Sequence, residues 1–478
     1  MVYKPEASEQ MDTTHTTLIK DKLLDLFEKQ QEAIRGTATP MVNRIRQHAL
    51  SRFRKNGFPT PQLENWRFTD LKPLLNTEFV FDFSNKSRSM DIEKIFTCDV
   101  YDLDTFSITL LNGWFVYKNA PLTKLTNGTI IGSLAKAMEI YPELTDQYFG
   151  RAAKVDQHEL AALNTAFVQD GLFIYVPDGV EVEKPIQLIN IVNAEHPMFL
   201  QPRHLVIAGK NSKMTLVHCD HSLTHNVSFT NTVMEIFAEE NATVEHYKIQ
   251  NKGRNSALVT NNFIHQKKSS NVYTNMITLN GGFTKNILEV TLAEPYCRSE
   301  HYGLYLVDSN QHVDNQIYID HMAPDCYSNQ LYKGILDDEA RAVFSGKVLV
   351  RRNAQHTIAH QNNKNILLTD DAKANTQPHL EIYADDVKCS HGATVGQLDP
   401  EAMFYLRSRG LCERTARQMM MIAFAGEVVS KISIEALQER IHHLVEKRLK
   451  GELSICDQCV LHCNSKEPTT FNIDMSKI

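Results

Sequence analysis

Residues 205–218 read LVIAGKNSKMTLVH, which is a β-type run, a short polar turn and a second β-type run. The same texture returns in MEIFAEENATVEHYKI (234–249), FIHQKKSSNVYTNMITL (263–279), VTLAEPYCRSEHYGLYL (290–306) and GILDDEARAVFSGKVLV (334–350). The turns recur at first about every 27 to 30 residues and then at longer intervals. A loose period in all-β sequence favours a solenoid, because one coil cannot bury its own apolar face whereas stacked coils form a continuous core.

The main alternative for this region is a β-sandwich, which would need several hairpin turns of the Asn-Gly type. Only Asn280-Gly281 lies within the region, and Asn127-Gly128 lies before it. A strand-rich sequence with so few hairpin signals fits coils that cross from one sheet to another. We therefore predict a mainly β chain whose core, residues 151–398, is a parallel β-helix.

The residues before this core, 17–150, predict helices that give way to a mixed region. Apolar residues recur at helical spacing up to Ile34, and a second such pattern follows Pro40. Trp66 and Phe68 stand in an irregular, proline-containing segment. The simplest interpretation is that both rings anchor this segment by packing against the body.

Helices are predicted to follow the core over residues 399–451. Asp399-Pro400-Glu401 combines an N-cap, a proline at the first helical position and an acid in the first turn, and Gly410 marks the end of that helix. A second helix is expected over 417–432, and Ser433 can cap the last one.

The helix over 417–432 carries three consecutive methionines, Met419 to Met421, close to Phe424. Unbranched methionine side chains form adaptable apolar surfaces of the kind that grip partner proteins. The same surface could pack on the β body instead, and the sequence leaves both interpretations open.

Composition argues against several classes of function. The formal net charge of −7 does not suggest a nucleic-acid binder, and no apolar run reaches the roughly 18 residues that a membrane span needs. Residues 1–16 are polar and expected to be disordered, with Glu6 and Glu9 where a transit peptide would avoid acids. Nine cysteines without a secretion signal predict free thiols and a cytoplasmic location.

Cys389 and His391 are the paired reactive residues of the predicted core. Because side chains two residues apart on a strand share one face, the thiol and the imidazole can project together. Such a pair suits the binding of a soft metal or the transfer of sulfur. A buried cysteine beside a hydrogen-bonded histidine is the structural alternative.

Two kinds of enzyme are functional alternatives. A thiol or acyl transferase could use Cys389 as nucleophile and His391 as base, but no oxyanion motif, phosphate loop or His-Glu-x-x-His accompanies them. A β-helix carbohydrate-active enzyme would need clustered carboxylates. Asp370-Asp371 and Asp385-Asp386 fit turns better, because adjacent acids on a strand point to opposite faces. The sequence therefore favours a chain that is not an enzyme.

The last segment, residues 452–478, is rich in soft metal ligands. Their spacing is plausible for zinc or an iron–sulfur cluster, and a flexible, weakly metal-binding tail is the alternative. The candidate ligands are Cys456, Cys459, His462 and Cys463.

Three stretches resemble the SufB/SufD family, the scaffold proteins of the Suf iron–sulfur assembly system. NILLTDDAKANTQPHLEIYADDVKCSHGATVGQLDPEAMFYLRSRGL (365–411) is similar to that family's signature, and LNTAFVQDGLFIYVPDGVEVEKPI (163–186) looks like its entry into the β-helix. ENWRFTDLKPL (64–74) is similar to the N-terminal segment of the D-type member. The resemblance covers most of residues 40–450 and does not extend to the cysteine-rich end.

Of the two members of that family, the D-type member is the better match. The B-type member typically has Glu-His-Glu-Ala-Thr where this chain has Ser390-His391-Gly392-Ala393-Thr394, and it carries a cysteine near the position of Asn365. That thiol is absent here, and Cys389-Ser390-His391 follows the D-type pattern.

The resemblance implies a right-handed parallel β-helix between an N-terminal and a C-terminal helical region, and a non-catalytic scaffold function. It implies pairing with a SufB-like subunit through the edges of the β-helix. Cys389 and His391 would lie at that interface, where an iron–sulfur cluster would be held transiently. A self-pairing homodimeric scaffold is the alternative assembly.

The resemblance also implies that the helices after Asp399 dock a SufC-like ATPase. That partner would bind the nucleotide, because this chain has no phosphate-binding loop. The residues expected at the docking contact are Phe404, Tyr405, Arg407, Arg409, Gly410, Met420 and Phe424.

Overall fold

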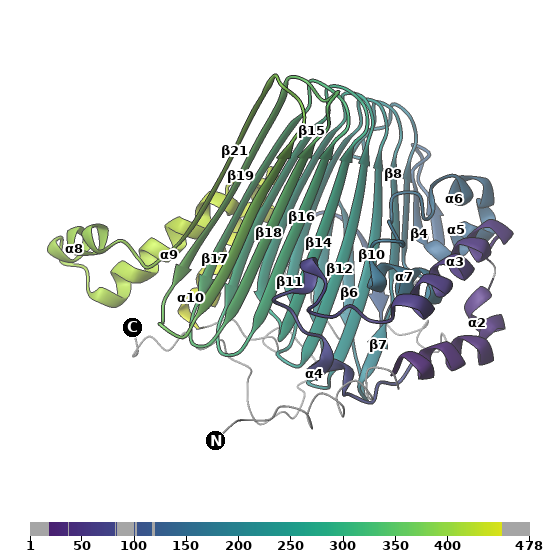
Figure 1. The fold of residues 1–478 in the computed structure, drawn as a ribbon, viewed down its shortest axis with the longest axis horizontal. Coiled ribbons are helices and arrows are strands. Elements are labelled where there is room, and N and C mark those ends of the chain that lie inside the picture. Colours follow the sequence, from purple (N-terminus) through teal and green to yellow (C-terminus); the bar gives the residue numbers. More distant parts are fainter. Residues whose placement is uncertain are drawn as a thin grey trace.

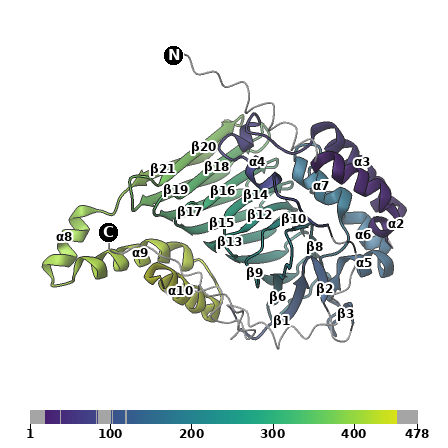
Figure 2. The same ribbon diagram turned by 90° about the horizontal axis from the view of Figure 1, so that it is seen from below.

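Parallel strands, stacked coil upon coil, form the body of the molecule (Figure 1). The structure is a computed structural model and describes residues 19–36, 38–81, 83, 100, 103–116 and 120–451. Each coil passes once through each of two sheets. The odd-numbered strands from β9 to β21 therefore lie in one sheet and the even-numbered strands from β8 to β20 in the other. Figure 2 shows these two sheets as two layers.

The first sheet runs in the order β2-β1-β6-β9-β11-β13-β15-β17-β19-β21. Its strands are β1 (Phe106–Leu111), β2 (Trp114–Val116), β6 (Ile186–Val192), β9 (Lys213–Ser222), β11 (Thr243–Asn251), β13 (Asn271–Asn280), β15 (Arg298–Val307), β17 (Tyr327–Leu336), β19 (Thr357–Leu367) and β21 (Val387–Gly396).

The second sheet runs in the order β20-β18-β16-β14-β12-β10-β8-β5-β4-β3, with β7 paired to β10. Its strands are β3 (Leu122–Lys124), β4 (Ile130–Ser133), β5 (Leu172–Val176), β7 (Met198–Leu200), β8 (Arg203–Ala208), β10 (Ser228–Ala238), β12 (Ser256–Gln266), β14 (Phe283–Leu292), β16 (His312–His321), β18 (Arg341–Val350) and β20 (Lys373–Ile382).

The pairing register sets the length of a coil. Thr243 of β11 pairs with Lys213 of β9 on one side and with Asn271 of β13 on the other, so one coil spans about 30 residues. Neighbouring strands from β5 and β6 onward are parallel, and the chain makes about eight turns. This arrangement confirms the predicted parallel β-helix, and the β-sandwich alternative is wrong.

Tight turns join each even strand from β8 to β18 to the next odd strand, and each of these turns carries one residue in the left-handed conformation. Asn211 and Asn241 adopt φ angles of 53° and 58°, and later turns place Ser269, Tyr296 or Asp325 at the same point. The Asn241 N–H donates to the Lys268 carbonyl oxygen of the next coil at 2.9 Å. The polar turns seen in the sequence therefore stack into a continuous ridge.

The interior between the sheets is partly apolar and partly polar. Isoleucine and valine side chains from both sheets, among them Ile236 and Val272, fill one part of it. Elsewhere buried amides pair with one another: Gln250 Nε2 donates to Asn286 Oδ1 at 2.8 Å, and Asn286 Nδ2 donates to Asn315 Oδ1 at 2.9 Å. Buried polar groups are tolerated here because they satisfy each other across the sheets.

The N-terminal helices cover the outer face of the even-strand sheet near its beginning (Figure 2). Residues 19–29 are helical, and Trp66 is buried as predicted. Phe68 was expected to be an anchor too, but its side chain is 37% exposed and lies under the Arg67 guanidinium. The remaining elements are α2 (Gln31–Arg35), α3 (Pro40–Asn56), the 3-10 turn η1 (Glu64–Trp66), α4 (Lys72–Leu75), α5 (Leu134–Ile140), α6 (Pro142–Tyr148) and α7 (Glu159–Phe167).

The C-terminal helices follow the last strand and are α8 (Pro400–Ser408), α9 (Glu413–Val429) and α10 (Glu435–Lys450). The Asp399 side chain caps α8 by accepting from the Glu401 N–H at 2.9 Å, as predicted. The prediction that Ser433 caps the last helix is wrong. Ile434 is the N-cap of α10, and the Ser433 side chain instead lies 3.0 Å from the Tyr247 hydroxyl of the sheet.

Within the described residues, no helix is long and apolar enough to cross a membrane. The predicted disordered segment 1–16 and the cysteine-rich segment 452–478 lie outside the described residues.

Buried histidines inside the coil stack predict that acid destabilises the fold. Burial lowers the pKa of His301 to about 3 and that of His321 to about 4, and both rings hydrogen-bond to neighbouring hydroxyl groups. In the unfolded chain the same rings would titrate near 6.5. Protons therefore favour the unfolded chain below that pH. Each histidine should cost about 1.4 kcal/mol of stability per pH unit between roughly pH 6.5 and pH 4.

The measurement is the free energy of unfolding by urea at pH 7 and pH 5. The variant His301→Gln should lose less stability between the two pH values than the unsubstituted protein. His225→Gln, at an exposed position, is the matched control and should behave like the unsubstituted protein. Equal acid sensitivity of both variants would contradict the assignment of His301.

Candidate functional site at the end of the coil stack

The two sheets end on β20 and β21, which are the last strands of their respective orders. Each has a strand partner on one side, β18 and β19 respectively. The outer edges therefore carry backbone groups that no described strand pairs. Pro378 lies within β20, and a proline inside a strand is found at sheet edges because it cannot donate to a neighbour. The end of the stack is thus an open pair of sheet edges.

Cys389 and His391 lie on β21 and face the interior side of the last coil. They pair in register with Ala359 and Gln361 of β19, both of which are buried between the sheets. Cys389 is half-buried against a small apolar cluster that includes Val348, and burial raises the pKa of its thiol. His391 is exposed. The structure therefore brings the predicted pair to one face of an accessible strand.

The chemistry available to this pair is limited by the number of ligands. A thiolate and an imidazole are good ligands for iron and other soft or borderline metals. Within the described part of the chain, no group of three or more His, Cys, Asp or Glu side chains is placed to hold a metal ion. Cys389 and His391 could complete a metal site only together with groups from outside the described chain.

A row of polar side chains, which the sequence did not predict, runs from His391 on the last coil toward the preceding coils. The register places His391 beside Gln361, and Gln361 beside Gln330, and the amide Nε2 of Gln361 donates to Gln330 Oε1 at 3.0 Å. The available signal was the alternation of Gln361, Asn363 and Asn365 in β19, which puts three amides on the buried face. Amides at every second position of a buried strand indicate a polar interior.

The carboxylates of the carbohydrate-enzyme alternative do not gather on a sheet. Asp370 and Asp371 lie in the bend before β20, and Asp385 and Asp386 lie in the bend before β21. This placement agrees with the interpretation of these acids as turn residues and gives no paired carboxylates on one face.

Helix α8 carries most of the residues predicted to contact a partner, and it stands away from the body in both views (Figures 1 and 2). None of its residues is buried. Phe404 and Tyr405 are 74% and 58% exposed, and Arg409 stacks its guanidinium 5.2 Å from the Tyr405 ring. Arg407 and Gly410 are exposed as well.

The methionine run of helix α9 could either contact a partner protein or pack on the β body, and the structure shows where each side chain lies. Met421 is fully buried in the cluster that joins α9 and α10 to the odd-strand sheet. Phe424 packs against the same cluster and lies 4.2 Å from Lys333 Nζ. Met420 is half-buried, whereas Met419 is 47% exposed. Most of this surface therefore packs on the body, and only its edge faces outward.

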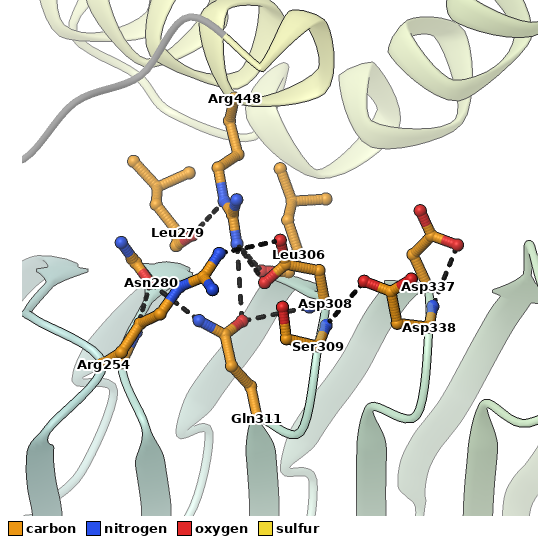
Figure 3. A network of polar contacts seen from close by, with 11 residues as sticks. Arg254, Leu279, Asn280, Leu306, Asp308, Ser309, Gln311, Asp337, Asp338 and Arg448 are labelled. Atoms are coloured by element: carbon orange, nitrogen blue, oxygen red, sulfur yellow. Dashed lines mark hydrogen bonds and ion pairs between the residues drawn. The ribbon is translucent and has the colours of Figure 1, made fainter. Parts of the chain in front are cut away.

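Arg448 fixes α10 to the turns of the solenoid (Figure 3). The guanidinium is fully buried; its Nε donates to the Leu279 carbonyl oxygen, and Nη2 donates to that of Leu306 at 3.2 Å. Asp308 lies 3.6 Å from Nη2 and is also 3.4 Å from Arg254. Withdrawing the guanidinium would leave the two buried carbonyls without this donor. Because α9 and α10 also share an apolar cluster with the odd-strand sheet, both helices pack on the body.

The four predicted ligands of the C-terminal tail, Cys456, Cys459, His462 and Cys463, lie outside the described residues. Their metal-binding role stays a prediction.

Comparison with known proteins identifies the family of this chain. A family model described as the SUF system FeS cluster assembly, SufBD core domain, matches residues 190–424, and a model of the SufBD protein N-terminal region matches residues 17–188. An iron–sulfur cluster assembly SufBD family protein of Synechocystis is 32% identical over 444 residues, which cover 91% of this chain and 96% of the relative. This chain belongs to the SufBD family.

Two relatives named iron–sulfur cluster assembly protein SufD are also similar to this SufBD protein. That of Escherichia coli is 29% identical over 408 residues, covering 85% of this chain and 92% of the relative. That of Bacillus subtilis is 24% identical over 458 residues, covering 91% and 99%. The resemblance stated from the sequence is thereby confirmed.

The SufBD protein should show contrasting reactivity at two thiols. The Cys412 thiol is exposed at the start of α9, 3.1 Å from the Thr415 hydroxyl, and this hydrogen bond lowers its pKa. Burial raises the pKa of Cys389. Iodoacetamide near neutral pH should therefore alkylate Cys412 about tenfold faster than Cys389 or more, because the thiolate is the reactive form.

Peptide mass spectrometry over a time course measures the two rates separately. In urea the rates should converge, since both shifts depend on the folded structure. Alkylation of Cys389 as fast as that of Cys412 in the folded protein would contradict its half-buried placement.

Proposed function

We propose that this chain is a non-catalytic scaffold subunit of iron–sulfur cluster assembly. It pairs end to end with a SufB-like subunit through the edges of β20 and β21. Cys389 and His391 then provide a thiolate and an imidazole as ligands at the interface between the two subunits. The iron–sulfur cluster bound there is the product being assembled, not a resident cofactor. The observation that carries the proposal is the position of both residues on β21, the last strand of its sheet, whose outer edge pairs with no described strand.

The open edges favour pairing because strands of a second subunit can continue both sheets. An unpaired edge donates and accepts backbone hydrogen bonds, and strand addition satisfies them. The same partner would supply the further ligands that the described residues of this chain lack around Cys389 and His391. A second copy of this chain could use the same edges, so the mass of the assembly distinguishes the heterodimer from the homodimer.

The exposed helix α8 supports the second part of the proposal, which is docking of a SufC-like ATPase. Phe404 and Tyr405 present two aromatic rings beside Arg407 and Arg409. Exposed aromatic and arginine side chains are the residue types that anchor protein interfaces. Because α9 and α10 are tied to the sheets, force applied by a partner at α8 would pass directly into the solenoid.

Replacing His391 tests whether its imidazole contributes to cluster assembly at the proposed subunit interface. His391→Ala should leave the fold and the assembled complex intact, because the side chain is exposed and lies at the end of the stack. Cluster content after co-expression with SufB-like and SufC-like partners should fall roughly tenfold, a typical effect of disturbing a metal site's ligand shell. Iron and acid-labile sulfide per complex, together with native mass spectrometry, provide the readout.

His379→Ala is the matched control, because His379 is an exposed histidine on β20, the last strand of the other sheet. It lies 3.3 Å from Glu381 and should leave cluster content unchanged. Full cluster content in His391→Ala would remove this imidazole from the mechanism. Loss of the complex itself would show that His391 serves assembly instead.

Replacing the two α8 aromatics tests the docking of the ATPase. Removing the whole C-terminal region would uncover the apolar face of the odd-strand sheet, so point substitutions are cleaner. Phe404→Ala combined with Tyr405→Ala should weaken ATPase binding at least about thirtyfold, as expected for interface anchors worth about 2 kcal/mol. Titration calorimetry with the purified ATPase measures the change.

Glu439→Ala, at an exposed position of α10, is the control and should bind the ATPase normally. Circular dichroism should be the same for all variants, since no residue of α8 is buried. Unchanged affinity of the double variant would place the docking surface elsewhere.

A further inference from the structure

Two cysteines occupy equivalent positions on consecutive coils of the solenoid. Cys297 directly precedes β15 and Cys326 directly precedes β17, and the next residues, Arg298 and Tyr327, pair in register. The Tyr327 N–H donates to the Cys297 carbonyl oxygen at 2.9 Å, so the pairing extends to the cysteines. Adjacent strands lie about 4.8 Å apart, which falls within the roughly 4.4 to 6.8 Å between Cα atoms that a disulfide spans.

Both thiols also point the same way. Each cysteine is 1% exposed and belongs to the apolar cluster inside the stack. Their Sγ atoms share one neighbour, the Glu294 carbonyl oxygen, which lies 3.0 Å from Cys297 and 3.4 Å from Cys326. A hydrogen bond between the two thiols lowers the pKa of Cys297 and raises that of Cys326. The pair therefore contains one thiol that loses its proton more readily than the other.

The coils on either side show that the pair is limited to two thiols. The register places Ser270 at the equivalent position of the preceding coil and Thr357 at the equivalent position of the following coil. The Ser270 hydroxyl lies 3.9 Å from Cys297 Sγ. Hydroxyl side chains are thus accepted at this position of the coil, and sulfur is not required for packing. Two adjacent thiols without a third ligand suit a two-electron thiol–disulfide change.

We propose that Cys297 and Cys326 form a redox-active dithiol that a peroxide converts to a disulfide joining two consecutive coils. The Cys297 thiolate attacks one peroxide oxygen, the O–O bond breaks, and the departing hydroxide takes up a proton to leave as water. The resulting Cys297 sulfenic acid is attacked by the sulfur of Cys326. The S–S bond forms, the S–O bond breaks, and the hydroxide leaves as a second water with the Cys326 proton. Two thiols are oxidised and one peroxide is reduced.

A route for the oxidant exists through the adjoining turn. Tyr296 is next to Cys297 and is 58% exposed, and its φ of 65° is unfavourable for a bulky side chain. The other turns of the ridge place asparagine, serine, aspartate or histidine at this point, and asparagine, aspartate and histidine are the non-glycine residues found there most often. The turn over the dithiol is therefore the one expected to open most readily to a small molecule. This proposal is independent of the assembly function.

The test uses the purified full-length protein treated with hydrogen peroxide, alkylated and digested with trypsin. Cleavage after Lys285, Arg298 and Lys333 places the two cysteines in separate peptides, 286–298 and 299–333. The expected product is these two peptides joined, lighter by two hydrogens than their sum, and separated again by dithiothreitol. Oxidised protein should also melt a few degrees higher, because the disulfide closes a loop of about 30 residues.

The variants Cys297→Ser and Cys326→Thr copy the hydroxyl residues of the neighbouring coils and should fold normally. Each should abolish both the joined peptide and the rise in melting temperature. Cys219→Ser removes a buried thiol of the cluster beneath the C-terminal helices and should leave both intact. Recovery of peptides 286–298 and 299–333 fully alkylated after peroxide treatment, or joined to other cysteines instead of to each other, would overturn the proposal.

Discussion

In-register stacking of parallel coils is the constraint on which the rest of this structure depends. Each strand between β9 and β19 satisfies its backbone only because a strand of the coil before and one of the coil after lie beside it. A stack built in this way must end somewhere, and among the described strands its last coil has a neighbour on one side only. The open edge of β20 and β21 is therefore a direct result of the architecture, and Cys389 and His391 occupy it.

The sequence predicted the elements whose signals are local. Alternating β-type runs and polar turns indicated the coils, and Asp399-Pro400-Glu401 located the start of α8. Strand alternation placed Cys389 and His391 on one face, but their position at an edge depends on where the stack stops, and only the family resemblance suggested it. The predictions for Phe68 and Ser433 were wrong because tertiary packing decides both positions. Trp66 is buried whereas Phe68 faces outward beneath Arg67, and the Ser433 hydroxyl lies beside Tyr247 of the distant β11.

The polar interior was the least predictable feature. Apolar and polar residues alternate along these strands, and the usual inference is that the polar face meets water. Here helices cover much of the outer faces, and the amides of Gln250, Asn286 and Asn315 pair with one another between the sheets. Both faces of a strand are therefore buried, and the alternation alone does not tell the inside from the outside.

The contacts of Arg448 bear on how chains of this kind change in evolution. A solenoid lengthens easily when the segment coding for one coil is duplicated, since the new coil pairs with its copies. Arg448, however, bridges the carbonyls of Leu279 and Leu306, each one residue before the end of β13 and β15, which belong to consecutive coils. A coil inserted between them would roughly double their separation of about 4.8 Å, beyond the reach of one guanidinium. An inserted coil would therefore break one of the two contacts of Arg448, and we expect insertions to be tolerated better in coils that this arginine does not bridge.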